Sequence, residues 1–365
     1  WVTAFLGMTT KFVEVTLSHK YREKLPDGSM SGGPMYYIEN GLNMKWLAVV
    51  FSVCLLMMCL GTGNMPQISS ISVVLLDTFN IPKIATGLVL SVLVWLVIIG
   101  GIKRIAQIAS KLVPFMAFWY VVGGLAVIIS NYENIIPSFQ SIFIHIFTPT
   151  AAVGGFLGAS VAAALTRGVN RGLYSNEAGQ GSAPIAHASS KTENPIEEGM
   201  VSILEPFIDT IIICTLTGLV ILSSGVWNQK FENKFEASAM VFVDGTFSED
   251  NQSDATQLRN YYYGNNSEIE YTGSIEIVDG AINLNKVTLL HNRSIAENTF
   301  VYLSEDNSIF SGSLEVQDGK IVNIGDYTLR GDSLLLGADL TGKAFTKSIF
   351  GDFGQYIVAI GLLLF

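Results

Sequence analysis

Long runs of hydrophobic residues alternate with short polar loops along most of the chain. Most of these runs reach the roughly 20 residues that a bilayer-spanning helix needs. Only helices and closed barrels satisfy every backbone polar group inside hydrocarbon, and the alternating segments of about ten residues that are typical of a barrel are missing here. The pattern therefore predicts an all-α polytopic membrane protein. The apolar runs cover residues 1–17, 46–76, 84–101, 112–130, 151–165, 200–224 and 356–365.

The pattern changes to a period of two between residues 227 and 347. Apolar runs there become short, and apolar and polar positions alternate in GSIEIVDG (273–280) and GSLEVQDG (312–319). The two segments repeat at a spacing of 39 residues, and each ends in an Asp-Gly pair, which favours a tight hairpin turn. We predict an inserted all-β domain built from short hairpins, arranged as a sandwich or meander.

This change in period divides the chain into three parts. Residues 1–226 form a transmembrane core with six spans, residues 227–347 form the acidic β-rich insert, and residues 348–365 begin a seventh span. Because the chain starts at Trp1 and stops inside an apolar run, we expect a fragment that lacks both ends.

Charge separates the same parts of the chain. Only 14% of residues are charged, and the formal net charge is −10. Residues 1–224 carry 12 basic and 12 acidic residues, whereas residues 225–365 carry 9 and 19, so the excess acid lies in the insert and its flanks. An acidic chain disfavours a nucleic-acid partner. The three cysteines lie in apolar runs without metal-ligand spacing, and we predict buried small hydrophobes at Cys54, Cys59 and Cys214.

The loops between the spans predict an orientation. Ten Lys and Arg residues follow the first, third and fifth spans, whereas Lys83 stands alone in the intervening short loops. Positively charged loops stay in the cytoplasm. We therefore expect a multi-pass protein of the cell (inner) membrane, with residues 227–347 outside the cytoplasm.

Two spans are interrupted by residues that suit a binding site. The second run contains GTGNMPQ at 61–67, where Pro66 disturbs the helix and Asn64 and Gln67 share one face. Carboxamides at this depth can bind a small zwitterion, or they can join neighbouring helices. The fifth run is short and glycine-interrupted, which is typical of the broken helices of transporters but also of close helix packing.

Ionisable residues also occur inside the spans. Lys11 and Glu14 lie in the first, and Glu205 and Asp209 lie one turn apart in the sixth, with Thr210 beside them. Asp209 is a candidate for a cation or proton role, and the alternative is a hydrogen bond between helices. We expect loop positions, without metal partners, for His145 and His187. The sequence has no nucleophile elbow, phosphate loop or paired-histidine signature, so no catalytic residue and no enzyme activity is predicted.

Four segments carry a resemblance to a known family: SGGPMYYIENGL (31–42), GTGNMPQ (61–67), GGIKRI (100–105) and RGLYSNEAGQGSAPIAHA (171–188). They resemble the sodium:alanine symporter family, also called the alanine/glycine:cation symporters. The resemblance implies a LeuT-type fold of inverted repeats and inward transport of alanine or glycine together with sodium. Whether the substrate is alanine or glycine, and the coupling ion sodium or a proton, stays open.

The resemblance also implies roles for individual residues. The substrate would be bound by Gly63, Asn64, Gln67, Ala163, Leu165, Thr166 and Gly168. Asp209 and Thr210 would be cation-related. The cytoplasmic gate would be formed by Arg171, Ser175, Asn176 and Glu177. No cofactor is implied, and sodium is the only metal ion expected. A long β insert departs from the family pattern, and it leaves open a partner at the outer surface or, as a rival function, a membrane receptor that binds its ligand through the β domain.

Overall fold

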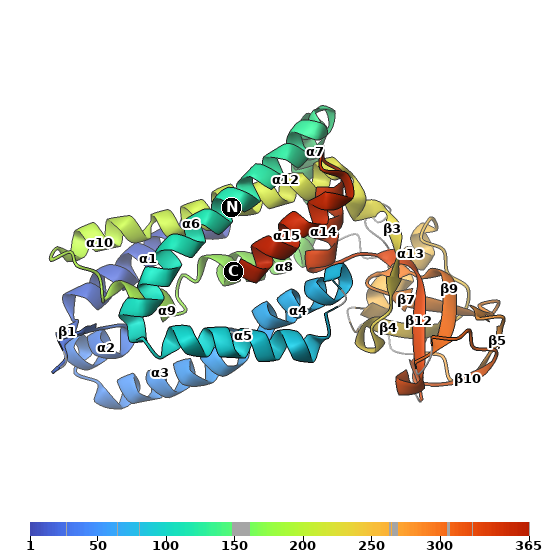
Figure 1. The fold of residues 1–365 in the computed structure, drawn as a ribbon, viewed down its shortest axis with the longest axis horizontal. Helices are drawn as coiled ribbons and strands as arrows, with labels where there is room; N and C mark the ends of the chain where they lie inside the picture. The colour runs from blue at the N-terminus through green and yellow to red at the C-terminus, as the bar shows by residue number, and fades with distance from the viewer. Residues whose placement is uncertain are drawn as a thin grey trace. The chain divides into compact units, whose positions relative to one another are not determined.

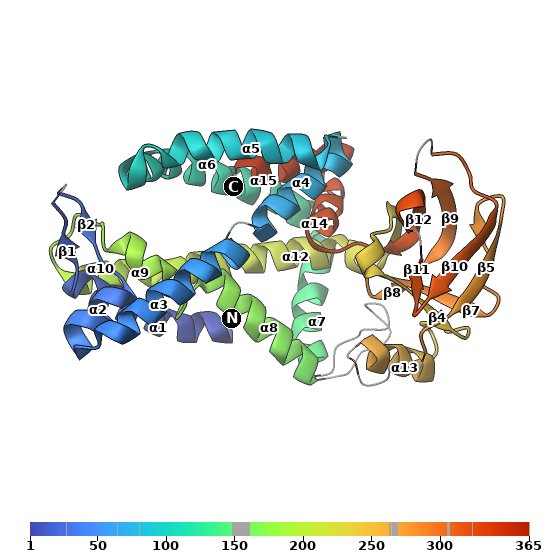
Figure 2. The ribbon, with the colours of Figure 1, turned by 90° about the horizontal axis from the view of Figure 1, so that it is seen from below.

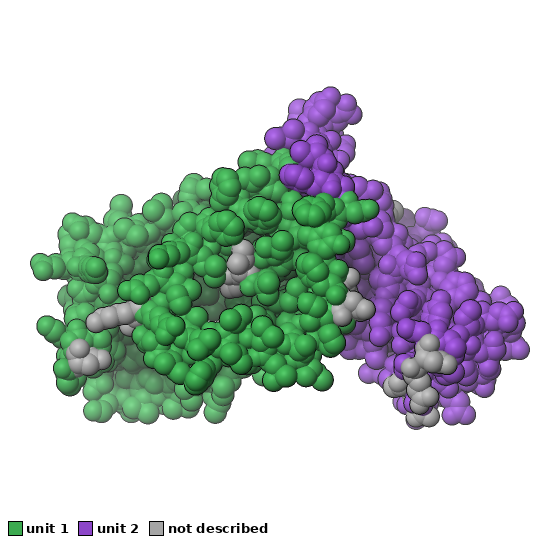
Figure 3. Space-filling model, viewed as in Figure 1, with its two compact units in different colours: residues 1–126, 165–220, 352–365 green, residues 127–164, 221–351 purple. Residues whose placement is uncertain are grey.

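The fold comes from a computed structural model. It describes the backbone of all residues except 27, 64, 80, 148–160, 263, 265–268, 305–306, 323 and 365. It describes no side chains at 62–63, 77, 102–103, 145–147, 161–164, 325 and 364 either. The chain forms two compact units, which Figure 3 shows in different colours. Unit 1 comprises Trp1–Ala126, Leu165–Val220 and Asp352–Phe365, and unit 2 comprises Val127–Ala164 and Ile221–Gly351.

Unit 1 is helical apart from one short strand pair. Its helices follow the apolar runs of the sequence, and some begin with a local signal: Pro34 opens α2, and the Asn194 side chain accepts a hydrogen bond from the backbone N–H of Ile196 in α10. The helices that lie wholly or partly in unit 1 are α1 (Val2–Lys20), α2 (Pro34–Leu42), α3 (Lys45–Met58), α4 (Met65–Phe79), α5 (Lys83–Ile98), α6 (Gly101–Ser130), α8 (Val161–Asn176), α9 (Ser182–His187), α10 (Pro195–Ser202), α11 (Leu204–Pro206), α12 (Cys214–Ser224) and α15 (Gly354–Leu364). The strands are β1 (Glu23–Lys24) and β2 (Met30–Ser31).

Three continuous helical segments of the described chain are long and apolar enough to cross a membrane. They are Lys45–Leu76, Arg104–Ser130 and Pro195–Ser224, and two shorter apolar helices are Lys83–Ile98 and Gly351–Leu363. The prediction of a largely helical, membrane-type protein is therefore confirmed. The number of spans and the LeuT-type arrangement stay predictions.

The three cysteines correct one expectation. Cys54, Cys59 and Cys214 are free and exposed on helix surfaces rather than buried. The reason is physical: in a helix that faces lipid, apolar side chains lie on the outside of the protein, so a hydrophobic position in the sequence does not mean a position in a protein core.

Helix α1 is the packing centre of one end of unit 1. It contacts α2, α9, α10 and α11. Helices α1, α2, α9 and α10 lie together in both ribbon views (Figures 1 and 2). The contact with α10 is close because Gly199 has no Cβ, and a Cβ there would overlap Thr16 and touch the ring of Phe12. Small residues permit this approach between membrane helices.

Unit 2 contains the remaining helices and most of the strands. The α-helices are α7 (Ile135–Phe147), α13 (Gln252–Tyr262) and α14 (Gly337–Thr346). The strands are β3 (Lys230–Lys234), β4 (Met240–Asp244), β5 (Gly273–Val278), β6 (Ala281–Ile282), β7 (Val287–His291), β8 (Ser294–Ile295), β9 (Glu297–Leu303), β10 (Gly312–Gln317), β11 (Lys320–Ile321) and β12 (Tyr327–Leu334).

The strands of unit 2 form two antiparallel sheets. One has seven strands in the order β11-β10-β5-β6-β9-β12-β3, and the other has three in the order β4-β7-β8. Alternate residues of β5, β9 and β10 point into a common hydrophobic core with residues of β4, β7 and β12. A smaller core joins α13 to β4 and β7 through residues such as Leu258 and Leu290.

Both predicted hairpin turns are present. Asp279 and Gly280 join β5 to β6 with φ of 50° and 81°, and Asp318 and Gly319 join β10 to β11 with φ of 48° and 71°. Positive φ at both turn residues gives the turn whose twist matches a two-stranded hairpin. The sequence spacing of 39 residues is thus the spacing of two equivalent hairpins.

The two hairpins belong to two copies of one structural unit, and the hairpin of each copy packs against the other copy. The first copy contains β4 to β7 and the second contains β9 to β12; β5 pairs with β10 so that Ile275 lies opposite its own equivalent, Leu314. Each hairpin turn is then bound by the other copy. The backbone hydrogen bonds, donor first, are Gly280 N to Phe310 O (3.0 Å), Val301 N to Gly280 O (2.8 Å), Gly319 N to Tyr271 O (2.9 Å) and Phe242 N to Gly319 O (2.8 Å). The equivalent bonds on the two sides show a local two-fold relation.

His291 is a neutral, buried histidine in this β structure. Its side chain is 1% exposed and stacks on Phe235 with ring centroids 4.2 Å apart. Nδ1 lies 2.7 Å from Ser333 Oγ, and Nε2 accepts the backbone N–H of Glu236 at 3.3 Å. Burial lowers the pKa of His291 from 6.5 to about 4, because removal from water disfavours the charged form of the imidazole.

The stability of unit 2 is therefore expected to fall in weak acid. Between about pH 6.5 and pH 4 the unfolded chain binds a proton at His291 that the folded chain does not bind, so the free energy of unfolding decreases as pH falls through this window. The loss reaches about 3 kcal/mol by pH 4. Urea titrations at pH 7.5, 6 and 4.5, read out by protease cleavage within residues 230–334, measure it. The variant His291→Gln should lose this part of the pH dependence; an unchanged pH dependence in that variant would contradict the assignment.

Candidate functional site

The predicted interruption of the second span is present as a change of helix type. The α-helix α3 ends at Met58, a π-helical stretch covers Cys59–Gly63, and α4 begins at Met65. Of the predicted substrate residues, Gly63 ends the π-helical stretch and Gln67 is exposed on α4, whereas Asn64 lies outside the described residues. A π-helical turn leaves the regular hydrogen-bond ladder and is frequent at functional sites.

The predicted broken helix is described from its second half. Ala163 lies in α8, and its side chain is outside the described set. Leu165, Thr166 and Gly168 lie on α8 with exposed surfaces, and a Cβ on Gly168 would meet no atom within 4 Å. These residues and Gln67 are not enclosed in the described structure, so their role in substrate binding stays a prediction.

The end of α8 is, in contrast, closely packed. Asn176 is 1% exposed; its Oδ1 accepts the backbone N–H of Ala178 at 3.0 Å, and its Nδ2 donates to the carbonyl of Thr3 in α1 at 3.3 Å. Glu177 follows in the left-handed region with φ of 52°, which turns the chain out of the helix, and its carboxylate accepts the hydroxyl of Ser182 at 2.8 Å. Of the predicted gate residues, Arg171 lies exposed on α8.

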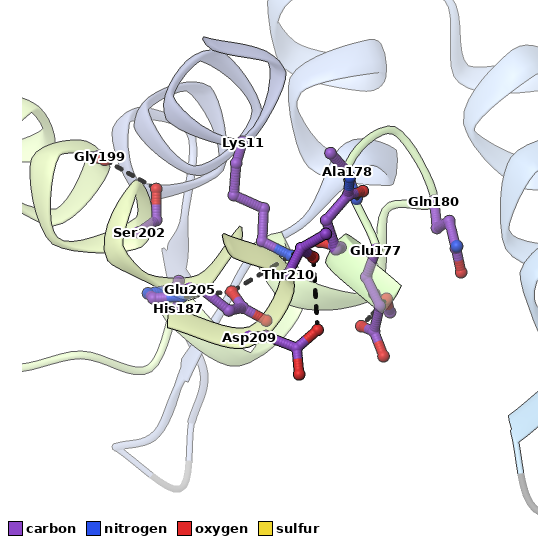
Figure 4. A network of polar contacts seen from close by, with 12 residues as sticks. Lys11, Glu177, Ala178, Gln180, His187, Gly199, Ser202, Glu205, Asp209 and Thr210 are labelled. Carbon is purple, nitrogen blue, oxygen red and sulfur yellow. Dashed lines mark hydrogen bonds and ion pairs between the residues drawn. The ribbon is translucent and has the colours of Figure 1, made fainter. Parts of the chain in front are cut away.

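Lys11 projects from α1 to this helix end. Its side chain is 0% exposed, and Nζ lies 3.2 Å from the carbonyl oxygen of Asn176 and 3.2 Å from Glu205 Oε2 in α11. Figure 4 shows the lysine extending from α1 to Glu205. The last carbonyls of a helix have no partner within the helix and carry a partial negative charge, so an ammonium group is a suitable cap for α8.

Glu205 also faces a histidine. His187 Nδ1 lies 2.6 Å from Glu198 Oε1 in α10, and His187 Nε2 lies 3.7 Å from Glu205 Oε2. The carboxylates of Glu205 and Glu198 raise the pKa of His187 above its usual 6.5 and outweigh the opposite effect of its burial. Basic and acidic groups thus alternate from Lys11 through Glu205 and His187 to Glu198.

Asp209 lies one turn after Glu205 and binds α8 from the other side. Its Oδ2 accepts a hydrogen bond from Ser175 Oγ, and Ser175 Oγ lies 3.2 Å from Thr210 Oγ1. Both Asp209 and Thr210 belong to a second π-helical stretch, Phe207–Ile213. The structure thus brings together Asp209, Thr210 and Ser175, which the sequence assigned to a cation site and to a gate. Figure 4 shows Asp209 and Thr210 beside Glu205.

This arrangement has the chemistry of a site for a hard cation. A carboxylate and two hydroxyls supply oxygen ligands, and a π-helical turn changes the partners of nearby backbone carbonyls. Among the described residues, no group of three or more His, Cys, Asp or Glu side chains gathers in a metal-binding cluster. The side-chain ligands around Asp209 are oxygen atoms, which hard cations prefer and soft transition metals do not.

The segment after α9 is fixed to the end of α1. Ser18 Oγ donates to the carbonyl of Pro184 at 2.7 Å. Arg22 binds the backbone carbonyls of three residues at 2.8–3.1 Å, and these are Ala188, Ser190 and Thr192. The sequence motif at 171–188 is thus held by Ser18 at Pro184 and by Arg22 at Ala188.

Sequence reasoning missed the contacts that organise this region. His187 is the last residue of α9 and binds Glu198, and His145 lies within α7, so the expectation of loop positions is wrong for both. Lys11 and Glu205 are both visible in the sequence as charges in apolar spans, but their ion pair joins residues 194 positions apart. Only the burial of a lysine in a membrane span signals that such a partner must exist.

Long apolar helices, π-helical interruptions and charges buried between helix ends together define a polytopic helical membrane protein of the transporter class. The chain belongs to the sodium:alanine symporter family, whose sequence profile matches residues 1–311. Membership of this family of symporters indicates a transporter rather than an enzyme.

Curated relatives from bacteria and an archaeon agree with this placement. The chain is 46% identical over 229 residues to an uncharacterized transporter of Haemophilus influenzae, which covers 62% of the chain and 50% of the relative. It is 43% identical over 230 residues to the sodium/alanine symporter AgcS of Methanococcus maripaludis, covering 62% and 50%. It is 37% identical over 223 residues to the amino-acid carrier protein AlsT of Bacillus subtilis, covering 61% and 47%. The chain thus spans about half the length of the relatives it matches.

Proposed function

We propose that this chain is part of a sodium-coupled symporter that moves a small neutral amino acid, alanine or glycine, into the cell by alternating access. Family membership and the similarity to a sodium/alanine symporter support the substrate and ion. The observation that carries the proposal is Asp209, a carboxylate inside an apolar helix that accepts hydrogen bonds from Ser175 on α8 and from its neighbour Thr210. A carboxylate at such a position destabilises the protein unless it binds a cation or another partner.

The proposal includes the fold and the sidedness of the protein. The transmembrane part would adopt a LeuT-type fold in the cell (inner) membrane, with the positively charged loops in the cytoplasm. Residues 227–347 would then lie outside. Arg22 and Lys191 lie at the end of unit 1 that α1, α9 and α10 form, so this end would face the cytoplasm.

The ion site would be centred on Asp209. Its carboxylate provides the negative charge, Ser175 and Thr210 provide hydroxyl ligands, and the π-helical stretch Phe207–Ile213 provides backbone oxygens. Because Ser175 lies on α8 and Asp209 on the segment after α11, a bound sodium ion would hold these two elements together.

The substrate site would lie between the two interrupted helices. Free backbone N–H groups at the interrupted part of α8 would bind the substrate carboxylate, and carboxamides and carbonyls near Asn64 and Gln67 would bind its ammonium group. Gly63, Ala163, Leu165, Thr166 and Gly168 would form the remaining wall, and these small or compact side chains leave room only for a small amino acid. The gate below it would comprise Arg171, Ser175, Asn176 and Glu177.

The full-length protein, reconstituted in proteoliposomes, is expected to accumulate labelled alanine when sodium is high outside and low inside. The initial rate should fall at least tenfold when sodium is replaced by choline, and unlabelled glycine should compete whereas leucine should not. A protonophore separates the two coupling ions, because it abolishes uptake only if protons drive it. Uptake that is equal with and without a sodium gradient would contradict the proposed function.

A further inference from the structure

Lys11 is among the largest fully buried side chains of the described residues, and its burial needs an explanation beyond folding. Burying an ammonium group away from water is unfavourable unless the group is paired and hydrogen-bonded. A buried ion pair seldom stabilises a protein more than apolar residues of the same size, because the loss of hydration opposes the attraction between the charges. A methionine would fill the same volume, so packing alone does not account for a lysine at this position.

The contacts of Lys11 join three elements. Nζ lies 3.2 Å from the last carbonyl of α8, at Asn176, and 3.2 Å from Glu205 in α11, while the lysine itself is part of α1. Nothing else in the described contacts links the carbonyl of Asn176 to the carboxylate of Glu205. Lys11 is therefore a bridge between the end of α8 and the segment that continues into the second π-helical stretch.

A second bridge runs beside the first between the same two segments. Ser175, the residue before Asn176, binds Asp209, which lies one turn after Glu205. The two bridges differ in kind: the first uses a third helix and a full charge, and the second is a direct hydrogen bond at the ion site. If the first is broken, the direct hydrogen bond of Ser175 to Asp209 remains, but the end of α8 loses its charged link to Glu205, so the distance between Ser175 and Asp209 is held less firmly.

We propose that Lys11 is a positioning residue of the transport cycle: its ammonium group locks the end of α8 to Glu205 and thereby sets the distance between Ser175 and Asp209. This inference rests on the proposed symport function. Glu205 is suited to be the releasable partner, because its side chain is 43% exposed whereas Lys11 is fully buried. Glu205 also has a second basic group beside it, His187 Nε2 at 3.7 Å, which compensates its carboxylate whenever the imidazole is protonated.

The experiment measures the position of α8 separately from transport. Ala178 is buried directly after the end of α8, at 9% exposure, so Ala178→Cys reports whether this end has moved away from α1. The reporter is placed in the full-length protein after Cys54→Ala, Cys59→Ala and Cys214→Ala. Its rate of labelling by a membrane-impermeant maleimide is measured in inside-out vesicles, with and without sodium and alanine, alongside sodium-driven alanine uptake.

Lys11→Met is expected to raise the labelling rate at least tenfold, to remove the effect of sodium on labelling, and to lower the maximal uptake rate at least tenfold. Glu205→Gln should raise labelling to a smaller extent, because Lys11 still binds Asn176, and Lys11→Arg should stay within threefold of the parent. Lys191→Met is the matched control: it removes an exposed lysine from the segment after α9 and should change neither measurement.

The outcomes separate the two proposals. Labelling and uptake that are unchanged in both Lys11→Met and Glu205→Gln overturn the positioning role. If Lys11→Met does not reach the membrane, Glu205→Gln alone decides, and parental labelling in it overturns the role. A parent that does not transport alanine refutes the proposed function, while the labelling rates still test whether Lys11 holds α8. Full recovery of uptake in Lys11→Met with Glu205→Gln would show that Lys11 only neutralises Glu205, and this also overturns the role.

Discussion

Replacing Asp209 by asparagine in the full-length symporter is expected to lower sodium-driven alanine uptake about 100-fold, which corresponds to about 3 kcal/mol. Asparagine has the same shape and can still bind Ser175 Oγ, so the contact between the two helices is kept. What is lost is the negative charge that compensates a desolvated cation, and in a low-dielectric site this charge has a large effect. Initial rates over a range of sodium concentrations measure the change.

A control variant at another acidic residue shows whether the loss of uptake is specific to Asp209 or follows from removing any carboxylate. Glu133 is an exposed carboxylate in the short helix Tyr132–Asn134, and Glu133→Gln should leave the uptake rate within twofold of the parent. Asp209→Asn should also weaken the dependence of the rate on sodium. Uptake within twofold of the parent, with the same dependence on sodium, would exclude Asp209 from the ion site.

Replacing Gly331 by valine is expected to destabilise the β structure of unit 2 by about 3 kcal/mol. A Cβ at Gly331 would lie 2.7 Å from the carbonyl oxygen of Glu297 and 3.0 Å from the Cα of Thr299, both on β9. These are backbone atoms, so no side-chain rotation relieves the overlap. The position coincides with a shift in register between β12 and β9, from Arg330 to Asp332, where the two strands approach irregularly.

The control is a glycine with open space around it. A Cβ at Gly342 in α14 would meet no atom within 4 Å, and alanine is favoured over glycine in a helix by about 1 kcal/mol, so Gly342→Ala should be neutral or stabilising. Urea titration with protease cleavage within residues 230–334 as the readout compares both variants with the parent. Equal midpoints for Gly331→Val and the parent would show that β9 and β12 adjust without cost.

Local sequence patterns predicted the local structure well. Helices follow the apolar runs because helical periodicity and length are properties of consecutive residues. The two Asp-Gly turns follow for the same reason, since their positive φ values depend on the residues at the turn itself. The π-helical stretch Cys59–Gly63 falls within the span that the sequence marked as interrupted.

Contacts between distant segments could not be predicted in the same way. The ion pair of Lys11 and Glu205 depends on how α1 packs against α11, which no spacing along the chain encodes. The sequence predicts a loop position without metal partners for His187, yet this residue ends α9 and a turn of the chain brings Glu198 to within 2.6 Å of it. For Asp209 and Ser175, the sequence named both residues but assigned them separate roles, and only the structure joins them.

The repeat in unit 2 shows the same difference between local structure, which the sequence predicts, and contacts between distant segments, which it does not. The 39-residue spacing shows two similar hairpins, but it does not show that each is bound by the other copy. Whether a hairpin returns to its own copy or crosses to the other depends on the length and path of the connections. In the first copy the connection after β4 includes helix α13, whereas in the second copy it is short.

The crossing of the hairpins has a consequence for how this β structure can arise. In a chain with a single copy, the glycine N–H of the hairpin turn would lack its acceptor, which is the carbonyl of Phe310 or Tyr271 in the other copy. The carbonyl of that single copy would in turn lack the glycine N–H that it accepts here. Two such chains would satisfy these groups in each other, with the axis between Ile275 and Leu314 as their symmetry axis. The β structure is thus the covalently linked counterpart of a symmetric homodimer, and cutting the link between β8 and β9 should leave two halves that remain associated.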